Sequence, residues 1–417
     1  MEFARPHAPT IRDITRRYYT VWGMYSFAGG FLFGVYPIFL HSRGLNQFQI
    51  NSVLATYFVV LFLTDVPTGA FADLLGRRRS FVLGASLRVA AFLLYFVAHH
   101  YYVFIIAESI DGIGTTFGNG AIDAWGVDAL DEAGYDGLKD RLFSRISQLT
   151  TLGFMGSAMI GAYVADMNIA WPWILGACGY VVAGIVGAIL MHDERPRAVN
   201  VRIAAIPLQV ASRITEGIRS GFNAPTVLML SAAGAITVGA WAPYWVSWPI
   251  MFNQSLGVGV WIIGWIYCGL ASARLIGAEV SARFILDEAQ RAARVSMLVI
   301  AASAMLFLAG LFGGRPVISL SMLFVMNLFT GAMMPLVQSW FNEQVESVNR
   351  ATLLSFRSTF ETMGGSIGLL FAGRIADTAG IPFEWQIAGL ISLCAAPVYW
   401  EMRRRELAEV ALAGTAK

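Results

Sequence analysis

Long apolar runs recur at nearly regular intervals along the 417 residues of this sequence. A helix needs roughly 20 mostly apolar residues to cross the hydrocarbon core of a bilayer, and lipid admits only helices and closed barrels. Runs of this helical length therefore predict an all-α polytopic membrane protein with twelve spans. In chain order, the predicted spans are residues 18–41, 48–72, 80–98, 101–128, 142–165, 170–191, 223–251, 257–282, 294–313, 316–342, 351–376 and 382–401.

The composition supports a membrane protein. Only 13% of the residues are charged, where a soluble protein carries about 25%, and this excludes soluble enzymes and disordered proteins. A net charge of +2 gives no basic footprint for a nucleic-acid partner. Cys178, Cys268 and Cys394 lie inside apolar runs, without the spacing of metal ligands or disulfides, so we expect no metal and no cofactor.

The basic residues set the predicted orientation, because they are retained on the cytoplasmic side of a membrane. Only Arg43, Arg315 and Arg374 fall on the opposite side when the N-terminus is placed inside. We therefore place both termini in the cytoplasm. Residues 1–17 lack the apolar core and cleavage site of a signal peptide, so the first span is expected to direct insertion.

The spans divide into two sets of six. The longest polar interruption, residues 192–222, predicts a cytoplasmic linker between an N-terminal bundle at 1–191 and a C-terminal bundle at 223–417. A shift of about half the chain aligns Gly30 with Gly239 and is consistent with an internal repeat, as in many transporters.

The loop between the second and third spans carries the most specific motif. It reads Pro67-Thr-Gly-Ala-Phe-Ala-Asp-Leu-Leu-Gly-Arg-Arg-Arg79 and resembles the signature G-x-x-x-D-[RK]-x-G-[RK]-[RK] of the major facilitator superfamily. Leu74 departs from the usual basic residue. The positions that match are Gly69, Asp73, Gly76, Arg77 and Arg78. With the layout of the spans, the resemblance covers the whole chain and implies two pseudo-symmetric bundles of six helices.

Roles for these residues follow from physical needs and from the resemblance. A tight turn requires Gly76, and Gly69 would allow close helix approach. The resemblance implies that Asp73 lies at the N-terminus of the eleventh span and that Arg77 pairs with Asp128, which together would latch the cytoplasmic side. The alternative is an arginine triplet that only fixes the topology.

The fourth and fifth spans depart from the motifs of drug/proton antiporters in this family. Glu108 stands where those proteins carry an arginine, and residues 153–161 have the glycines of the antiporter motif without its Gly-Pro step. These departures put the usual proton relay in doubt, so motifs alone do not establish export.

Ionisable residues inside the spans are functional candidates, because each costs at least about 2.5 to 3.5 kcal/mol to insert. The candidates are Asp65, Glu108, Asp111, Arg274, Arg357 and Glu361. Glu108 and Asp111 share one helical face, where they could hold a proton or a cationic substrate, or simply lie in a water-filled mouth.

The remaining charges suggest an ion pair between the bundles. Asp65 and Arg357 are positioned to pair across them, and the alternative is a pair of Arg357 with Glu361 inside one helix. Arg88, in the third span, is expected to make an internal polar contact rather than to bind substrate.

Aromatic and neutral polar residues supply a candidate cavity wall. The resemblance implies that the first, fourth, seventh and tenth spans line a central cavity, and the alternative is an interfacial aromatic belt. The candidate residues are Tyr25, Phe31, Trp241, Tyr244, Trp245, Asn327 and Gln338.

The sequence lacks a Walker loop, a CxxC spacing and an intact catalytic constellation, so we do not expect an enzyme. The prediction is a monomeric secondary transporter of the cytoplasmic (inner) membrane that exports a small organic or drug-like solute in exchange for protons by alternating access. The alternatives are proton-coupled uptake of a small anionic metabolite and, in a different class, a lipid flippase or a non-transporting membrane sensor.

Overall fold

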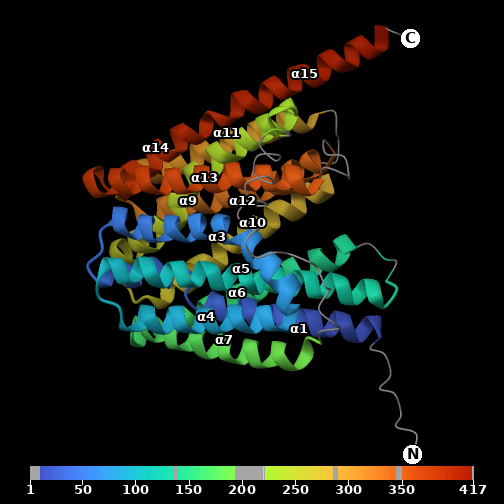
Figure 1. The fold of residues 1–417 in the computed structure, drawn as a ribbon. Helices are drawn as coiled ribbons and strands as arrows, with labels where there is room; N and C mark the ends of the chain where they lie inside the picture. Colours follow the sequence, from blue (N-terminus) through green and yellow to red (C-terminus); the bar gives the residue numbers. More distant parts are fainter. Residues whose placement is uncertain are drawn as a thin grey trace, which may run out of the picture. The chain divides into compact units, whose positions relative to one another are not determined.

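The computed structural model describes residues 10–135, 137, 139–192, 219, 221–284, 290–343 and 350–415. Every regular element in this part of the chain is a helix (Figure 1). The helices are α1 (Ile11–Gly30), α2 (Val35–Ser42), α3 (Gln47–Leu75), α4 (Arg77–Val97), α5 (Tyr101–Glu132), α6 (Lys139–Met167), α7 (Trp171–Leu190), α9 (Pro225–Leu256), α10 (Trp261–Phe284), α11 (Arg291–Leu311), α12 (Pro316–Glu343), α13 (Arg350–Ala379), α14 (Ile381–Leu393) and α15 (Ala395–Thr415).

These helices confirm the twelve predicted spans and the all-α fold. The first span is α1 and α2, interrupted by a turn at residues 31–34, and the last span is α14 and α15, interrupted at Cys394. Each of the other ten spans is one helix. Within the described residues, nine segments are long and apolar enough to cross a bilayer by length and composition.

The chain divides into two compact units. Unit 1 comprises Met1–Val35 and Leu63–Ile206, and unit 2 comprises Tyr36–Phe62 and Pro207–Lys417. Unit 2 thus contains α2 and the first half of α3 as well as the last six spans. The predicted linker, residues 192–222, lies almost wholly outside the described residues, so its boundaries stay a prediction.

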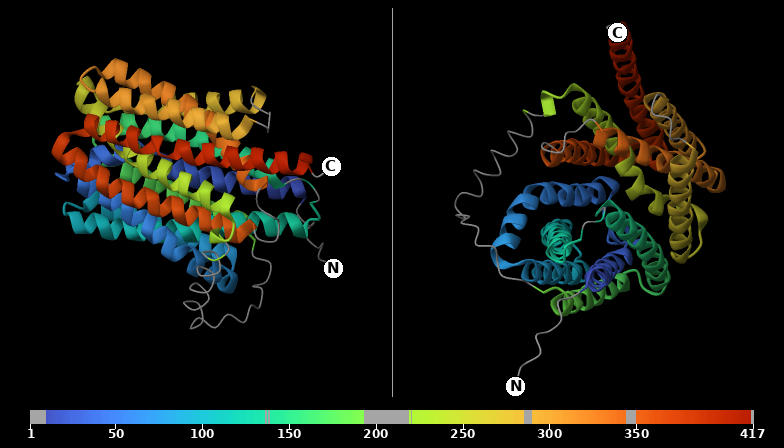
Figure 2. Two further views of the ribbon diagram at one scale, coloured as in Figure 1. Left: turned by 90° about the horizontal axis from the view of Figure 1, so that it is seen from above. Right: turned by 90° about the vertical axis from the view of Figure 1, so that its right-hand side faces the viewer.

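The same packing pattern occurs in both units. In unit 1, α4 packs on α5 and α7, while α1 packs on α6 and α7. In unit 2, α11 packs on α12 and α14, while α9 packs on α13 and α14. Figure 2 shows the helices of each unit running side by side. The repeated pattern confirms two pseudo-symmetric bundles.

Glycines set the closest helix contacts at equivalent places in the two repeats. A Cβ on Gly161 of α6 would overlap the backbone carbonyl of Phe31. A Cβ on Gly368 of α13 would overlap the carbonyl of Gly239 on α9. Small residues allow such close backbone approach, which drives helix association in lipid.

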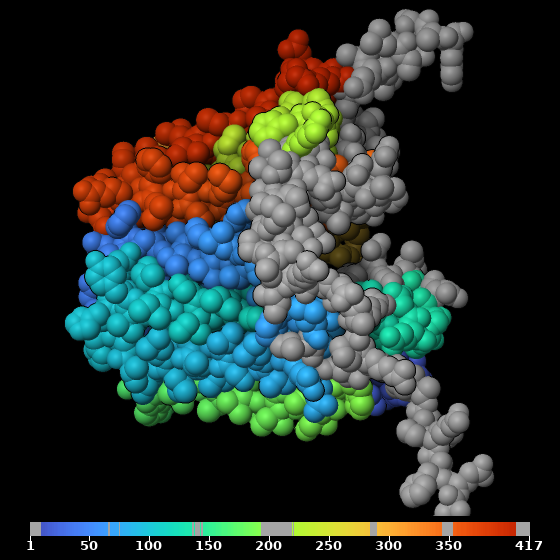
Figure 3. Space-filling view, in the orientation of Figure 1, coloured from blue at the N-terminus to red at the C-terminus, as the bar shows by residue number. Residues whose placement is uncertain are grey.

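The side chains that face outward are those expected of a lipid-facing surface. Figure 3 shows α4, α5 and α7 beside one another on one face of unit 1. Large apolar side chains are exposed on these helices, including Val97, Ile106, Val182, Ile185 and Ile189. Such extended exposed apolar patches mark contact with a membrane.

Candidate functional site

The signature loop forms the tight turn that the sequence predicts. α3 ends at Leu75 and α4 begins at Arg77, and Gly76 between them has a φ of 96°, which only glycine adopts readily. The Arg77 Nη2 atom lies 2.6 Å from Asp73 Oδ1, and its Nε atom lies 3.7 Å from Asp128 Oδ2. Arg77 therefore joins the end of α3 to the end of α5 within unit 1.

Two other residues of the loop behave differently. Within unit 1, a Cβ on Gly69 would have no described atom within 4 Å, so close approach of a helix at Gly69 stays a prediction. The side chain of Arg78 is exposed. The contact of Asp73 with the eleventh span would join the two units and stays a prediction.

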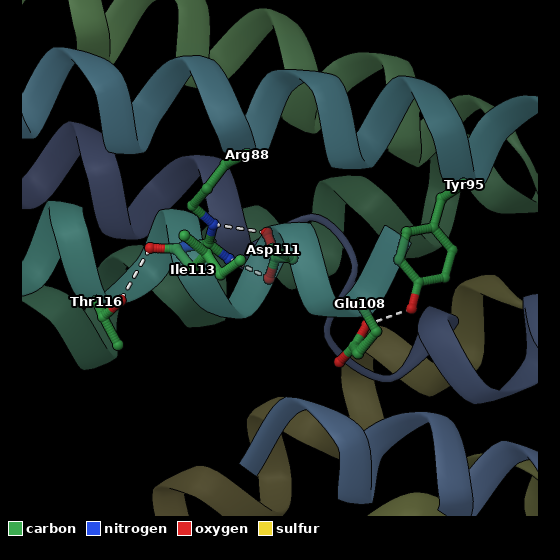
Figure 4. A network of polar contacts seen from close by, with 6 residues as sticks. All are labelled: Arg88, Tyr95, Glu108, Asp111, Ile113 and Thr116. Atoms are coloured by element: carbon green, nitrogen blue, oxygen red, sulfur yellow. Dashed lines mark hydrogen bonds and ion pairs between the residues drawn. The ribbon is translucent and has the colours of Figure 1, made fainter. Parts of the chain in front are cut away.

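Arg88 and Asp111 form a buried ion pair in unit 1 (Figure 4). Arg88 Nε lies 2.8 Å from Asp111 Oδ1, and Arg88 Nη2 lies 3.1 Å from Asp111 Oδ2. The guanidinium also lies over the rings of Tyr180, at 4.3 Å, and Tyr25, at 5.4 Å. The predicted internal contact of Arg88 is confirmed, and its partner is one of the two carboxylates on α5.

Glu108 contacts a different partner on α4. Its carboxylate accepts a hydrogen bond from the hydroxyl of Tyr95, and Figure 4 shows these two side chains pointing toward each other. Glu108 is 5% exposed, and Tyr95 stacks on Trp173 of α7 at a centroid distance of 4.0 Å. The two carboxylates of the predicted pair therefore have different partners. Asp111 contacts the charged Arg88, and Glu108 contacts the neutral hydroxyl of Tyr95.

Asp123 is a functional candidate that the sequence analysis missed. Its Oδ1 atom accepts hydrogen bonds from Tyr18 Oη and Trp22 Nε1 of α1, both at 2.8 Å. The half-buried carboxylate thus ties the first span to the fourth. Its position inside an apolar span could have identified it, as it did for Asp111.

The predicted cavity residues of the first span are buried within unit 1. Tyr25 is 2% exposed and contacts the rings of Phe81 and Tyr180. Phe31 is 5% exposed and meets Phe27 edge to face. Both side chains belong to the packed interior of the unit, and their contact with substrate stays a prediction.

In unit 2, two neighbouring residues of α9 contact polar groups on other helices. Trp245 lies under the guanidinium of Arg274, with its ring centroid 5.4 Å away. The hydroxyl of Tyr244 accepts a hydrogen bond from Asn327 Nδ2 at 3.0 Å, and both side chains are fully buried. These contacts bring together four of the predicted residues. Trp241 is half-buried and Gln338 is exposed.

Arg357 forms its ion pair with Glu361, which was the alternative to a pair with Asp65. Its Nε atom lies 2.7 Å from Glu361 Oε1 within α13, and its guanidinium lies over Phe341 at 5.0 Å. Asp65 is exposed in unit 1. A pair of Asp65 with Arg357 would join the two units and stays a prediction.

Glu384 is a second carboxyl that the sequence analysis missed. It is 1% exposed, and its Oε1 atom lies 3.3 Å from the hydroxyl oxygen of Ser247 on α9. That oxygen also accepts a hydrogen bond from Trp385 Nε1 at 2.8 Å. Glu384 lies in the first turn of α14, at the edge of a predicted span, where an acid usually reaches water. Among the described residues, no group of His, Cys, Asp and Glu side chains is arranged to hold a metal ion.

Comparison with curated proteins finds partial matches. NorA of Staphylococcus aureus (strain MRSA252), a quinolone resistance protein, is 20% identical over 166 residues, which are 40% of this chain and 42% of NorA. YhjO of Bacillus subtilis (strain 168), an uncharacterized MFS-type transporter, is 23% identical over 161 residues, which are 38% of this chain and 39% of YhjO. Each match thus covers less than half of the relative.

Solved structures share the fold over nearly the whole chain. A bacterial homologue of the human lysosomal transporter Spinster has a TM-score of 0.72 at 14% identity, covering 96% of this chain and 98% of its own. The nucleoside transporter NupG has a TM-score of 0.69 at 14% identity, covering 93% and 98%. The family model described as Major Facilitator Superfamily matches residues 20–347. The chain therefore belongs to the Major Facilitator Superfamily.

Proposed function

We propose that this protein is a secondary active transporter of the cytoplasmic membrane that exports small organic cations in exchange for protons. Both termini face the cytoplasm and the monomer is the working unit in this proposal. The observation that carries the proposal is that acidic and basic side chains inside the spans have different kinds of partners. Arg88 and Arg357 have carboxylate partners, whereas Glu108 and Asp123 accept hydrogen bonds from the neutral donors Tyr95, Tyr18 and Trp22.

The bases offer little to an anionic solute. Arg88 is held by Asp111 at 2.8 Å and Arg357 by Glu361 at 2.7 Å. An anion would have to displace a carboxylate from either guanidinium, and breaking a buried pair costs about 3 to 5 kcal/mol. Arg274, whose exposed side chain lies over Trp245, is the basic group through which the alternative of anion uptake would act.

The acids are suited to protons and cations. Glu108 accepts a hydrogen bond from Tyr95, and Asp123 accepts hydrogen bonds from Tyr18 and Trp22. A hydroxyl or indole donor is neutral, so protonation of such a carboxyl does not separate it from a charged donor of these contacts. When ionised, it attracts an organic cation, to which neighbouring aromatic rings add cation–π attraction.

The comparisons are consistent with export. The partial similarity to NorA, a quinolone resistance protein, supports a drug-like solute, and the fold shared with NupG and the Spinster homologue supports transport by alternating access. The resistance function belongs to NorA and extends to this chain only as part of the proposal.

Transport by purified protein in proteoliposomes tests the proposal. With the vesicle interior more acidic than the medium, exchange for protons should concentrate the fluorescent cation ethidium inside, and collapsing the pH gradient should release it. Glu108→Gln should abolish the gradient-driven accumulation. Glu279→Gln is the matched control, because that exposed acid pairs with Arg283 on its own helix.

The same vesicles separate the alternatives. With the gradient reversed, so that the medium is more acidic than the interior, accumulation of the anion carboxyfluorescein without ethidium movement, lost in Arg274→Ala, would replace export of cations with uptake of anions. Scrambling of a labelled phospholipid without movement of either dye would identify a flippase. Ethidium accumulation that Glu108→Gln leaves unchanged would remove Glu108 from the coupling mechanism.

A further inference from the structure

The hydroxyl of Ser247 is the centre of a small polar cluster in unit 2, defined by Ser247, Glu384, Trp385 and the carbonyl of Pro243. Trp385 Nε1 donates to Ser247 Oγ at 2.8 Å. The same oxygen lies 3.0 Å from the Pro243 carbonyl and 3.3 Å from Glu384 Oε1. Both Ser247 and Glu384 are buried, at 0% and 1% exposed.

The hydrogen bonds of this cluster favour a protonated Glu384. A serine hydroxyl has one hydrogen to donate and two lone pairs. The nearer acceptor is the Pro243 carbonyl, so Ser247 donates there and accepts from Trp385 with one lone pair. The second lone pair is then free to accept, and the group within reach of it is Glu384. A carboxyl can donate only when it carries a proton.

The alternative, an ionised Glu384, leaves a charge without compensation. Its Oε2 atom is buried and has no hydrogen-bond partner in the described structure. A buried carboxylate normally needs a paired charge or several donors, because the loss of its hydration is costly. A neutral carboxyl carries no charge to compensate, and its hydroxyl can donate to Ser247 Oγ.

No neighbouring charge changes this conclusion. α14 packs on α9, α11, α13 and α15, and on the α9 side its neighbours are the neutral Ser247 and Tyr244. The loop before α12 meets Pro382 through Gly313. None of the described charged side chains on these elements contacts Glu384; they are Arg291 and Arg294 on α11, Arg315 before α12, Arg357, Glu361, Arg374 and Asp377 on α13, and Glu401, Arg403, Arg404 and Arg405 on α15.

We propose that Glu384 is a proton-binding site that couples proton release to separation of the first turn of α14 from α9. Loss of the proton would leave a buried charge, so the carboxylate must reach water, and it can do so only if the start of α14 leaves Ser247. The site lies beside Gly380, in the turn between α13 and α14. This turn is predicted to face the outside, which would supply and receive the proton.

The role of this site in transport rests on the proposed proton exchange, whereas its occupancy by a proton does not. Infrared spectroscopy of the purified protein measures the occupancy directly, because only a protonated carboxyl shows its C=O stretching band. We expect such a band at neutral pH in the wild-type protein, lost in Glu384→Gln and retained in the exposed control Glu279→Gln. A protonated-carboxyl band that persists unchanged in Glu384→Gln would overturn the proposal.

Two further measurements keep the test independent of the folding of that variant. Ser247→Ala retains Glu384 but removes its acceptor, so the band should shift to higher frequency; an unshifted band would count against the assigned contact. Glutamine can donate to Ser247 as the protonated acid does, so Glu384→Gln should melt within a few degrees of wild type, and a large loss of Tm would indicate an ionised carboxylate. If the band is assigned to Glu384 but the protein moves no ethidium, the proton-binding site stands and the proposed export is wrong.

Discussion

Replacing Asp377 with alanine should release the first turn of α3 from the end of α13. Both segments belong to unit 2, and the two carboxylate oxygens of Asp377 accept hydrogen bonds from the backbone N–H groups of Gln47, at 2.8 Å, and Phe48, at 3.1 Å. The side chain of Asn46 accepts from the next amide, that of Gln49, at 2.8 Å. Asp377 thus supplies the acceptors for the first two amides of the helix.

The magnitude follows from these contacts. A helix start leaves its first amides without partners inside the helix, and loss of a capping acceptor costs about 0.5 to 2 kcal/mol. The negative charge at the positive end of the helix dipole adds about 0.3 to 1 kcal/mol at an exposed site. Since Asp377 is exposed, we expect about 1 to 2 kcal/mol for opening of this turn, or roughly a tenfold change in the opening equilibrium.

Hydrogen exchange measured by mass spectrometry reports on this turn. A peptide that contains Gln47 and Phe48 should exchange roughly tenfold faster in Asp377→Ala, by the conversion of free energy to equilibrium constant. Thr378→Ala is the matched control, because that hydroxyl donates to the carbonyl of Arg374 in its own helix. Equal exchange of the peptide in both variants and wild type would refute the reasoning. Acceleration across the whole of unit 2 would show that Asp377 stabilises more than this contact.

Three other substitutions test the packing and the charges, each by thermal unfolding in detergent. Gly161→Ala should destabilise by about 1 to 3 kcal/mol through overpacking, whereas Gly153→Ala on the same helix, with no described atom within 4 Å, should have little effect. Asp111→Ala should cost about 3 to 5 kcal/mol because the largely enclosed Arg88 loses its carboxylate partner, and joint replacement of both residues by apolar ones should recover most of the loss. Gly76→Ala should cost roughly 1 to 2 kcal/mol, since an L-residue is strained at its positive φ. The packing prediction is wrong if Gly161→Ala is as stable as Gly153→Ala. The ion-pair prediction is wrong if the double variant recovers no stability. An unchanged Tm for Gly76→Ala would contradict the prediction for the turn.

Features carried by local sequence could be predicted well. The spans follow from the length of apolar runs, and Gly76 was identified because its turn lies within one motif. The pair of Arg357 with Glu361 was also open to prediction, since residues four apart lie on one helical face whatever the tertiary structure. At Gly69 the motif predicts close packing that is absent within unit 1, because a motif does not specify which face of a helix is covered.

Contacts between distant segments could not be predicted, because they depend on how each helix is rotated about its axis. Asp377 caps a helix that begins 330 positions earlier in the chain. Glu384 was missed because acids at span ends usually face water, and its burial results from the packing of α14 on α9. Asp123 was missed although its position in an apolar span was visible, since only the fold brings Tyr18 and Trp22 to it.

The buried charges of the two units indicate which groups can change state during transport. Arg88 and Arg357 each lie against a carboxylate, and such pairs resist change because separation leaves two uncompensated ions. Glu108 and Glu384 each contact a hydroxyl group, from Tyr95 and Ser247 respectively. Loss of a proton from such a contact separates no ion pair, and at Glu384 it would leave a buried charge that reaches water only when the start of α14 leaves Ser247. In the proposed mechanism, the ion pairs stabilise the two units, whereas the carboxyl–hydroxyl contacts are the groups through which protons would drive alternating access.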